Sequence, residues 1–505
     1  MEEKIDDNIK TLSNKEKFGE VITPKSLVEE MYHVWNHAIH NTPLFMDDQV
    51  KIRKIFEPGS GNGVFYDVFY NHDEHPTCFG LPRDQVEYTM NEINAEHESS
   101  LKKRVHPRDQ SHTKLIMNDV FNIDFESDGT LCSYDLVVGN LPFNSANKKF
   151  VPALSQKTCK STTQYNHQIT AKTIWTSITH LCFEQILADN GIFFCIIPCI
   201  WLKPDRAGIY ELFCNTYTIH YLRIYNCQDA NKIFRYNCQT PICYVMVQKK
   251  WNIHKMMDDV ISHSDMWGLD AQSRIQNIQL YCTKREQFHP FQLIPGLCIP
   301  THHADLFQKH ISYFVNQHKN GKPVTSILQA IGNTFHKISS MKPSVYQAKT
   351  METKMFDLQL HKLDASDDAS YKIITGAKLF KDKSLGLNGF VSREQGCFQT
   401  HKKLILPHKR IPAFLEDRNG EYGCYGRDMY VWLCNTDHDM QKYQDLFQCS
   451  FIQEMIQFGF RVRMNFIEKY VFAYIPDPTS CHFDITEYCR FMNMDSNNSN
   501  NSNHS

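Results

Sequence analysis

The first half of the chain alternates short apolar runs with segments of helical pattern, and this alternation limits the fold more than any other feature of the sequence. Strand-like runs lie within 50–65, 86–104, 114–125, 134–140, 192–198, 220–227 and 240–250, and 173–191 has the pattern of an amphipathic helix closed by Asn190 and Gly191. Strands that alternate with helices predict an α/β fold with a doubly wound, mostly parallel sheet. Ligands of such sheets bind at the carboxyl ends of the strands.

The alternation stops near Lys250, and 505 residues are more than one compact core normally holds, so we predict a second domain. We expect a polar leader over 1–16, the α/β domain over 17–250 and an α+β domain over 251–480. The last stretch, 490–505, is rich in Asn and Ser and cannot bury a core, so we predict a disordered tail there.

Composition argues against several classes of protein. The 54 Lys and Arg residues balance 56 Asp and Glu residues, so any nucleic-acid binding must come from a local basic surface. The polar N-terminus is not a signal peptide and no apolar run reaches the length of a membrane span, so we expect an intracellular protein without membrane contact. The 18 Cys include no CxxC pair and the 25 His no HExxH pattern, which predicts buried reduced thiols and no metal site.

The segment FEPGSGNGVF follows a strand and opens a helix, and Gly59 and Gly61 allow its backbone to turn tightly and approach a ligand. Taken alone, such a turn also occurs in plain strand-to-helix connections. Acidic residues accompany three successive strand ends: Glu57 precedes this turn, Glu92 ends the next strand and Asp119 follows the third. Glu57 suits a cationic amino-acid group, Glu92 two ribose hydroxyls and Asp119 an adenine amine, which fits S-adenosylmethionine better than NAD. Three solvated loop acids are the alternative.

The strand at 134–140 ends on Asn140, and Leu141, Pro142 and Phe143 follow it. One chemistry that uses an amide, a carbonyl and an aromatic ring together is methyl transfer to the exocyclic amine of adenine. This amine is a poor nucleophile because its lone pair is conjugated with the ring, so it needs acceptors for its two N–H groups. The Asn140 side-chain oxygen and the Leu141 carbonyl can provide them, and Phe143 can stack on a base extruded from the duplex. No strong general base is required if the methyl group is transferred before the proton leaves.

Six segments, taken in order, resemble the gamma-class adenine-N6 DNA methyltransferases of type II restriction–modification systems. They are 17–32, 55–65, 90–96, 117–125, 135–144 and 173–204. The first, centred on Thr23 and Pro24, resembles the family's cofactor-closing motif, and the third, with Glu92 and Ile93, resembles its ribose-binding motif.

The resemblance implies a Rossmann-like catalytic domain over 17–250 that binds S-adenosylmethionine and methylates N6 of a flipped-out adenine in double-stranded DNA. It places Asn140 beside both the donor and the base, and it implies that 251–480 recognises the target. A separately encoded restriction endonuclease is compatible with such an enzyme.

Leu141 departs from the family, in which a proline is usual at this position, and this puts the stiffness of the carbonyl in question. A second aromatic, for the opposite face of the base, is expected at Phe234, with Tyr236 in reserve and a core role for Phe234 as the alternative. Related enzymes methylate RNA adenine or protein glutamine, and a decayed methyltransferase fold that only binds DNA or a partner is a further alternative. The large region after Lys250 favours DNA.

The window 372–410 is basic and contains interleaved phenylalanines. Lys402, Lys403, Lys409 and Arg410 are our candidates for phosphate contacts, because Lys and Arg neutralise phosphates and exposed aromatics stack on bases. A solvated basic surface over core phenylalanines is the alternative.

Overall fold

The computed structural model describes 21–41, 51–70, 77–78, 81–127, 129–143, 160–162, 168–170, 173–205, 207–235, 240–250, 275–283, 285–294, 296–327, 335–337, 355–356, 371–379, 385–392, 395–407, 414–424, 429–460 and 467–493. The chain forms two compact units, and each is described by itself. Unit 1 comprises 1–257, 276–281 and 288–295, and unit 2 comprises 258–275, 282–287 and 296–505.

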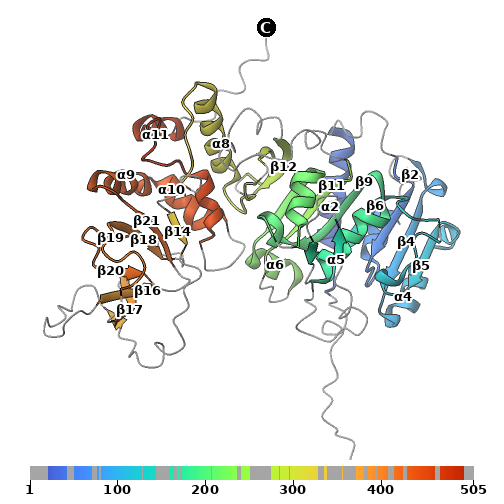
Figure 1. The fold of residues 1–505 in the computed structure, drawn as a ribbon. Coiled ribbons are helices and arrows are strands. Elements are labelled where there is room, and N and C mark those ends of the chain that lie inside the picture. The colour runs from blue at the N-terminus through green and yellow to red at the C-terminus, as the bar shows by residue number, and fades with distance from the viewer. Residues whose placement is uncertain are drawn as a thin grey trace, which may run out of the picture. The chain divides into compact units, whose positions relative to one another are not determined.

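Within the described residues, unit 1 is built on a nine-stranded sheet (Figure 1). From one edge to the other the strands are β13 (Gln287–Leu293), β12 (Gln276–Cys282), β10 (Thr218–Tyr225), β11 (Ile242–Gln248), β9 (Leu187–Pro198), β6 (Tyr134–Asn140), β1 (Lys54–Pro58), β4 (Glu87–Glu92) and β5 (Thr113–Met117). Neighbours from β9 to β5 pair in parallel, whereas β11 runs antiparallel to both β9 and β10.

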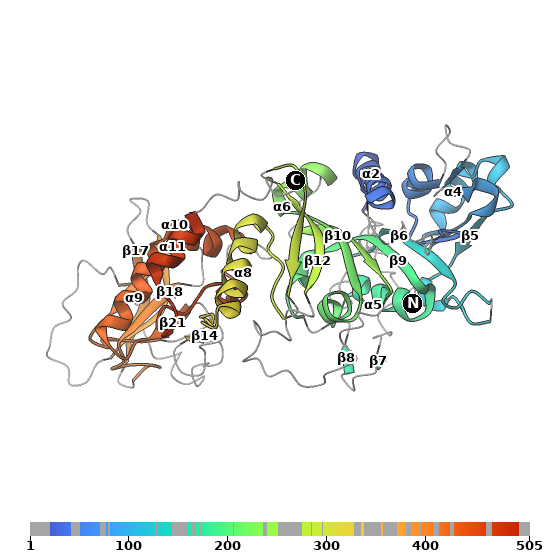
Figure 2. The same ribbon diagram turned by 90° about the horizontal axis from the view of Figure 1, so that it is seen from above.

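Both faces of this sheet are buried, because successive strand residues point to opposite faces and both kinds are apolar. Ile55 of β1 packs in the cluster under helix α2 (Lys25–Asn41), whereas its neighbour Phe56 contacts Phe125 and Tyr134 on the other face. Helices α2 and α4 (Glu98–Arg104) lie on one side of the sheet and α5 (Ile174–Leu181) on the other (Figure 2). The predicted doubly wound, mostly parallel α/β fold is confirmed.

The predicted helix over 173–191 is shorter in the structure. Helix α5 passes into a π-helical turn, η6 (Cys182–Ile186), and β9 begins at Leu187. Asn190 has the left-handed backbone (φ 63°) that the stop signal requires, but its N–H donates to the Lys249 carbonyl, so it pairs within the sheet. The prediction that Asn190 and Gly191 end the helix is therefore wrong, because both residues lie within β9.

The sheet continues past the predicted domain boundary near Lys250, because β12 pairs in parallel with β10 and β13 follows it at the edge. Gln276, at the start of β12, donates from its amide to the carbonyls of Cys214 and Tyr217 and accepts from the Ile219 N–H. These contacts tie a segment beyond residue 250 to the first unit.

Unit 2 combines strands and helices in its described parts. One sheet has the order β14 (Phe335–Lys337), β21 (Met429–Leu433), β18 (Lys403–Pro407), β19 (Leu415–Asp417), and another has β15 (Met355–Phe356), β17 (Leu385–Ser392), β16 (Tyr371–Leu379), β20 (Tyr422–Cys424). The helices are α8 (Ala304–Lys319), α9 (Asp437–Gln448), α10 (Ser450–Glu454) and α11 (Ile485–Asn493).

The predicted termini fall largely outside the described residues, which exclude 1–20 and 494–505. The start of the predicted tail is corrected, because α11 extends through 490–493 and buries Met492. An apolar helix face, rather than the Asn/Ser composition, decides the structure of these residues.

Candidate active site

The strand order reverses at the centre of the sheet, and this reversal locates the site. The chain adds β4 and then β5 on one side of β1 but places β6 on the other side. The loops that leave β1 and β6 at their carboxyl ends therefore run in opposite directions, and a crevice opens between them. The glycine turn follows β1 and the Asn140–Phe143 segment follows β6, so both candidate motifs meet at this point.

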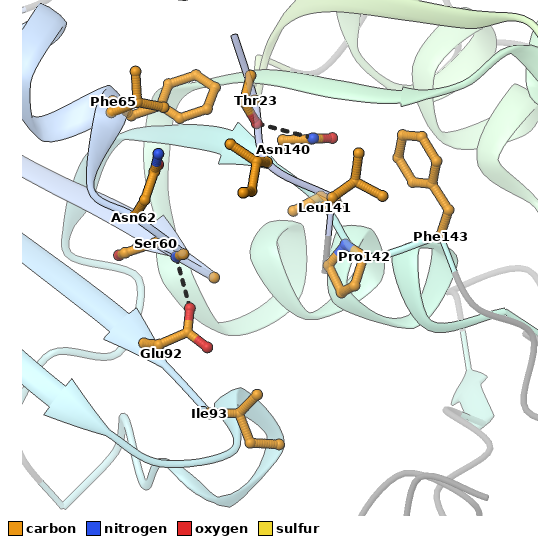
Figure 3. A pocket seen from close by; sticks show the side chains of 15 residues that line it. Thr23, Ser60, Asn62, Phe65, Glu92, Ile93, Asn140, Leu141, Pro142 and Phe143 are labelled. Carbon is orange, nitrogen blue, oxygen red and sulfur yellow. Dashed lines mark hydrogen bonds between the residues drawn. The ribbon is translucent and has the colours of Figure 1, made fainter. Parts of the chain in front are cut away.

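A pocket occupies this position, with about 710 Å³ of space between the atoms, open solvent included. The lining residues are Val21, Ile22, Thr23, Gly59, Ser60, Gly61, Asn62, Val64, Phe65, Glu92, Ile93, Asn140, Leu141, Pro142 and Phe143. Figure 3 shows Glu92 and Ile93 on one side of the pocket and the segment from Asn140 to Phe143 on another.

The glycine turn exposes its backbone to the pocket. Gly59 (φ 107°) and Gly61 (φ 52°) have conformations that disfavour any side chain. A Cβ atom at either position would meet no atom within 4 Å, so the space beside the turn is open. The Gly59 N–H donates to the Asn91 carbonyl over 2.8 Å, and this bond fixes the turn against the end of β4.

Glu92 holds the turn and also faces the pocket. One carboxylate oxygen accepts the Gly61 N–H over 2.7 Å and the other accepts the Asn94 N–H over 2.8 Å. The side chain is buried, yet each oxygen retains a further lone pair. The carboxylate can therefore accept hydrogen bonds from a ligand as well.

Asn140 is oriented by Thr23, which the structure brings into the pocket from the segment before α2. The Asn140 amide nitrogen donates to the Thr23 hydroxyl over 3.0 Å (Figure 3). The Asn140 side-chain oxygen is buried and has no hydrogen-bond partner among the described residues. Buried acceptors are normally satisfied, so an unpaired one in a pocket indicates a place for a ligand donor.

The residues after Asn140 form the wall of the pocket. Leu141 is buried, and its N–H donates to the Ile196 carbonyl over 3.2 Å, which extends the β6–β9 ladder by one bond. Pro142 and Phe143 are half-buried, and Phe143 packs against the same core as α2.

Two of the predicted acids do not line the pocket. Glu57 has no exposed surface and accepts a hydrogen bond from the Tyr88 hydroxyl over 2.9 Å. Burial, together with the smaller effect of the nearby Glu92 carboxylate, raises the pKa of Glu57 to about 8, against hydrogen bonds from Tyr88 and Ser60 that lower it. The other Glu57 oxygen, Oε1, has no hydrogen-bond partner among the described residues, so the predicted contact of Glu57 with a cationic ligand group stays a prediction.

Asp119 is buried at the end of β5, where one oxygen caps a short helical turn by accepting the Phe121 N–H over 3.0 Å. Its second oxygen has no partner among the described residues. Pro24 does not line the pocket either. Its carbonyl accepts the Leu27 and Val28 N–H groups at the start of α2.

Phe234 ends helix α6 (Cys227–Phe234) and packs against the same core cluster as Phe143, but it is not among the lining residues of the pocket. Its reserve, Tyr236, lies outside the described residues. The sequence reasoning missed six residues that do line the pocket: Val21, Ile22, Ser60, Asn62, Val64 and Phe65. Their positions beside Thr23 and within the glycine turn were the available signal.

The structure corrects one of the predicted phosphate contacts. The Lys403 side chain is fully buried and forms an ion pair with Asp417, so it cannot reach a phosphate. Lys402 is half-exposed and pairs with Asp437 over 2.8 Å. Lys409 and Arg410 lie outside the described residues.

In the described part of the chain, no helix has the length and hydropathy needed to cross a membrane. Within the same residues, no group of three or more His, Cys, Asp or Glu side chains could hold a metal ion.

Comparisons with known proteins give no family for this chain. No protein-family model and no curated protein matches the sequence. Similar solved structures include a protein from Vibrio vulnificus YJ016 described as the modification subunit of a type I restriction enzyme (13% identity, 53% of this chain and 49% of that one, TM-score 0.33). The EcoKI M protein of a type I restriction enzyme matches at 13% identity over 47% and 45% (TM-score 0.29).

The type IIL restriction–modification enzyme MmeI in complex with DNA matches at 8% identity over 91% of this chain and 68% of that one (TM-score 0.44). This chain thus spans about half the length of the two type I proteins. With TM-scores below 0.5, these similarities assign neither family nor function.

Proposed function

We propose that this protein is an intracellular DNA methyltransferase that transfers a methyl group from S-adenosylmethionine to the exocyclic N6 of an adenine extruded from double-stranded DNA. The observation that carries the proposal is the unpaired, buried side-chain oxygen of Asn140 in the pocket that the glycine turn and Glu92 also line. The motif order along the sequence supports the same reading.

The residues present fit the donor. Gly59 and Gly61 leave open space beside their backbone, which a methionine or ribose portion would fill. The free lone pairs of Glu92 suit ribose hydroxyls, Ile93 offers an apolar surface, and the unpaired oxygen of Asp119 suits an adenine amine. When bound there, S-adenosylmethionine supplies an electrophilic methyl group on its sulfonium.

Asn140 and Leu141 act on the target amine. With its nitrogen held by Thr23, the Asn140 amide presents its oxygen to one N–H of the amine, and the Leu141 carbonyl is the second acceptor. These hydrogen bonds draw the nitrogen lone pair out of conjugation and toward the methyl group. Phe143 stacks on the extruded ring, and Phe234 is our proposal for the opposite face.

Unit 2 is proposed to recognise the DNA. Phosphate contacts are assigned to Lys402, Lys409 and Arg410, without Lys403. A cognate endonuclease encoded separately would complete a restriction–modification pair. Methylation of RNA adenine or protein glutamine, and a fold that binds without transferring methyl groups, are outcomes that the experiment distinguishes.

In the test, the protein is incubated with labelled S-adenosylmethionine and, in separate reactions, with genomic DNA, total RNA or a protein extract. The label incorporated into each polymer is then measured. We expect uptake into DNA alone. Uptake only into RNA or protein would replace the substrate, and donor binding without transfer to any polymer would show a binding module.

A further inference from the structure

One carboxylate oxygen of Glu30, on helix α2, is an acceptor shared by two neighbouring strands of the sheet. Its Oε1 accepts from Arg223 Nη1 over 2.6 Å and from the hydroxyls of Tyr225 over 2.6 Å and Tyr244 over 2.7 Å. Arg223 and Tyr225 lie on β10 and Tyr244 on β11. The helix is thereby bonded to both strands at a single point.

The two tyrosines of this cluster are buried, whereas Glu30 and Arg223 are partly exposed. Tyr225 and Tyr244 are buried, and burial raises the pKa of both phenols well above the ordinary range, so both remain protonated donors. The Arg223 guanidinium lies 3.7 Å from the centre of the Tyr281 ring on β12 and 4.9 Å from that of Tyr225. Contact with these aromatic rings favours the orientation in which the guanidinium pairs with Glu30.

Helix α2 connects this cluster to the pocket. Its first turn is fixed to the preceding segment by the Pro24 carbonyl, which accepts from Leu27 and Val28. Thr23, just before that turn, lines the pocket and holds the Asn140 amide. Glu30 lies in the second turn of α2, which begins at Lys25, two residues after Thr23.

The apolar face of α2 cannot by itself set the height and rotation of the helix. Leu27, Met31 and Trp35 pack against the core, but apolar contact is largely non-directional. Hydrogen bonds to Glu30 have defined lengths and angles, so they select one position of the helix along the sheet.

We propose that Glu30 is a positioning residue for the reaction: by fixing α2 on β10 and β11, it places Thr23 at the pocket and so sets both donor affinity and the orientation of Asn140. The inference rests on the proposed function, and it assigns a role to a charged cluster that touches neither donor nor base.

The experiment compares Glu30→Ala, Glu30→Gln and Glu29→Ala. Glutamine keeps an oxygen for the two tyrosines, whereas alanine removes every acceptor. Glu29 is the matched control, because it lies next to Glu30 but is exposed and pairs at the surface with Lys25 over 3.4 Å. For each variant we measure the Kd of S-adenosylmethionine by calorimetry and the kcat and KM of methyl transfer. We also measure hydrogen exchange of the backbone amides in 21–28 in the absence of donor.

For Glu30→Ala we expect the donor Kd to rise about tenfold, which corresponds to Thr23 occupying its position in about a tenth of the molecules. We also expect a lower kcat and faster hydrogen exchange of the backbone amides in 21–28. Glu30→Gln should restore most of the affinity, and Glu29→Ala should match the wild type. If Glu30→Ala does not fold, Tyr225→Phe combined with Tyr244→Phe is the substitute, with the same expectations.

Unchanged exchange and unchanged Kd in a folded Glu30→Ala protein would overturn the inference. If the wild type itself bound no donor, the proposed function would fail instead. Exchange of 21–28 would then still report whether Glu30 positions α2.

Discussion

Replacing Leu141 with proline would give the tetrapeptide that is usual in the methyltransferase family that the sequence resembles, and the structure predicts that this change is harmful. The Leu141 N–H donates to the Ile196 carbonyl over 3.2 Å, and a proline has no N–H to donate. The Leu141 side chain is 1% exposed, so a smaller ring in its place leaves a void. In this chain, a hydrogen bond and a buried side chain hold the segment after β6 in place.

The magnitude follows from those two losses. Losing the hydrogen bond costs about 1 kcal/mol, and losing part of a buried leucine costs roughly 1–3 kcal/mol, less than a full truncation to alanine. We therefore expect Leu141→Pro to lower the free energy of unfolding of unit 1 by about 2–4 kcal/mol. Under the proposed function the Leu141 carbonyl accepts from the target amine, and the same bond holds the Leu141 backbone in place, so we also expect kcat to fall at least about tenfold.

The assays are urea unfolding and single-turnover methyl transfer. Leu141→Ala is the control, because it keeps the N–H and loses only the packing, so it should lose stability while retaining more of the rate than the proline variant. A Leu141→Pro protein as stable and as fast as the wild type would refute the reasoning and show that proline stiffness outweighs both losses.

Further predictions concern the acids, the stacking ring and the buried lysine. Between pH 4.5 and about 8 the folded state holds a proton on Glu57 that the unfolded state releases, so stability should fall as pH rises through this window, and Glu57→Gln should flatten the profile in urea unfolding. Glu92→Ala should weaken donor binding about ten- to a hundredfold in calorimetry, because ribose hydroxyls lose their acceptor; an unchanged Kd would remove Glu92 from the site. Phe143→Ala should raise KM for DNA, with about 1–3 kcal/mol lost in base stacking, and leave the donor Kd unchanged. Lys403→Ala should destabilise unit 2 by about 3–5 kcal/mol, since Asp417 is left buried without its partner, while the salt dependence of DNA binding stays the same; a smaller salt slope would place Lys403 at the phosphates after all.

The fold of the first unit and the place of its site could be read from the sequence, because both depend on local signals. Strand-to-helix alternation predicts a doubly wound sheet, and Gly59, Glu92 and Asn140 each stand where a strand ends. Thr23 was found through the resemblance alone. Its contact with Asn140 joins residues 117 positions apart, and no local pattern encodes such a distance.

What the sequence did not predict depends on burial and on pairing over long separations. Glu57 and Lys403 carry charges that suggest contact with ligands, yet both are fully enclosed by residues distant in sequence. The strands β12 and β13 join the sheet after a break in the alternation, so the boundary at Lys250 was placed too early.

The most direct test of the central claim is analysis of nucleosides from double-stranded DNA incubated with labelled S-adenosylmethionine and either the wild type or Asn140→Ala. The account predicts that the label appears in N6-methyladenine with the wild type, and that Asn140→Ala binds donor with nearly the wild-type Kd but transfers no methyl group. Label in N4-methylcytosine, or full transfer by Asn140→Ala, would contradict it.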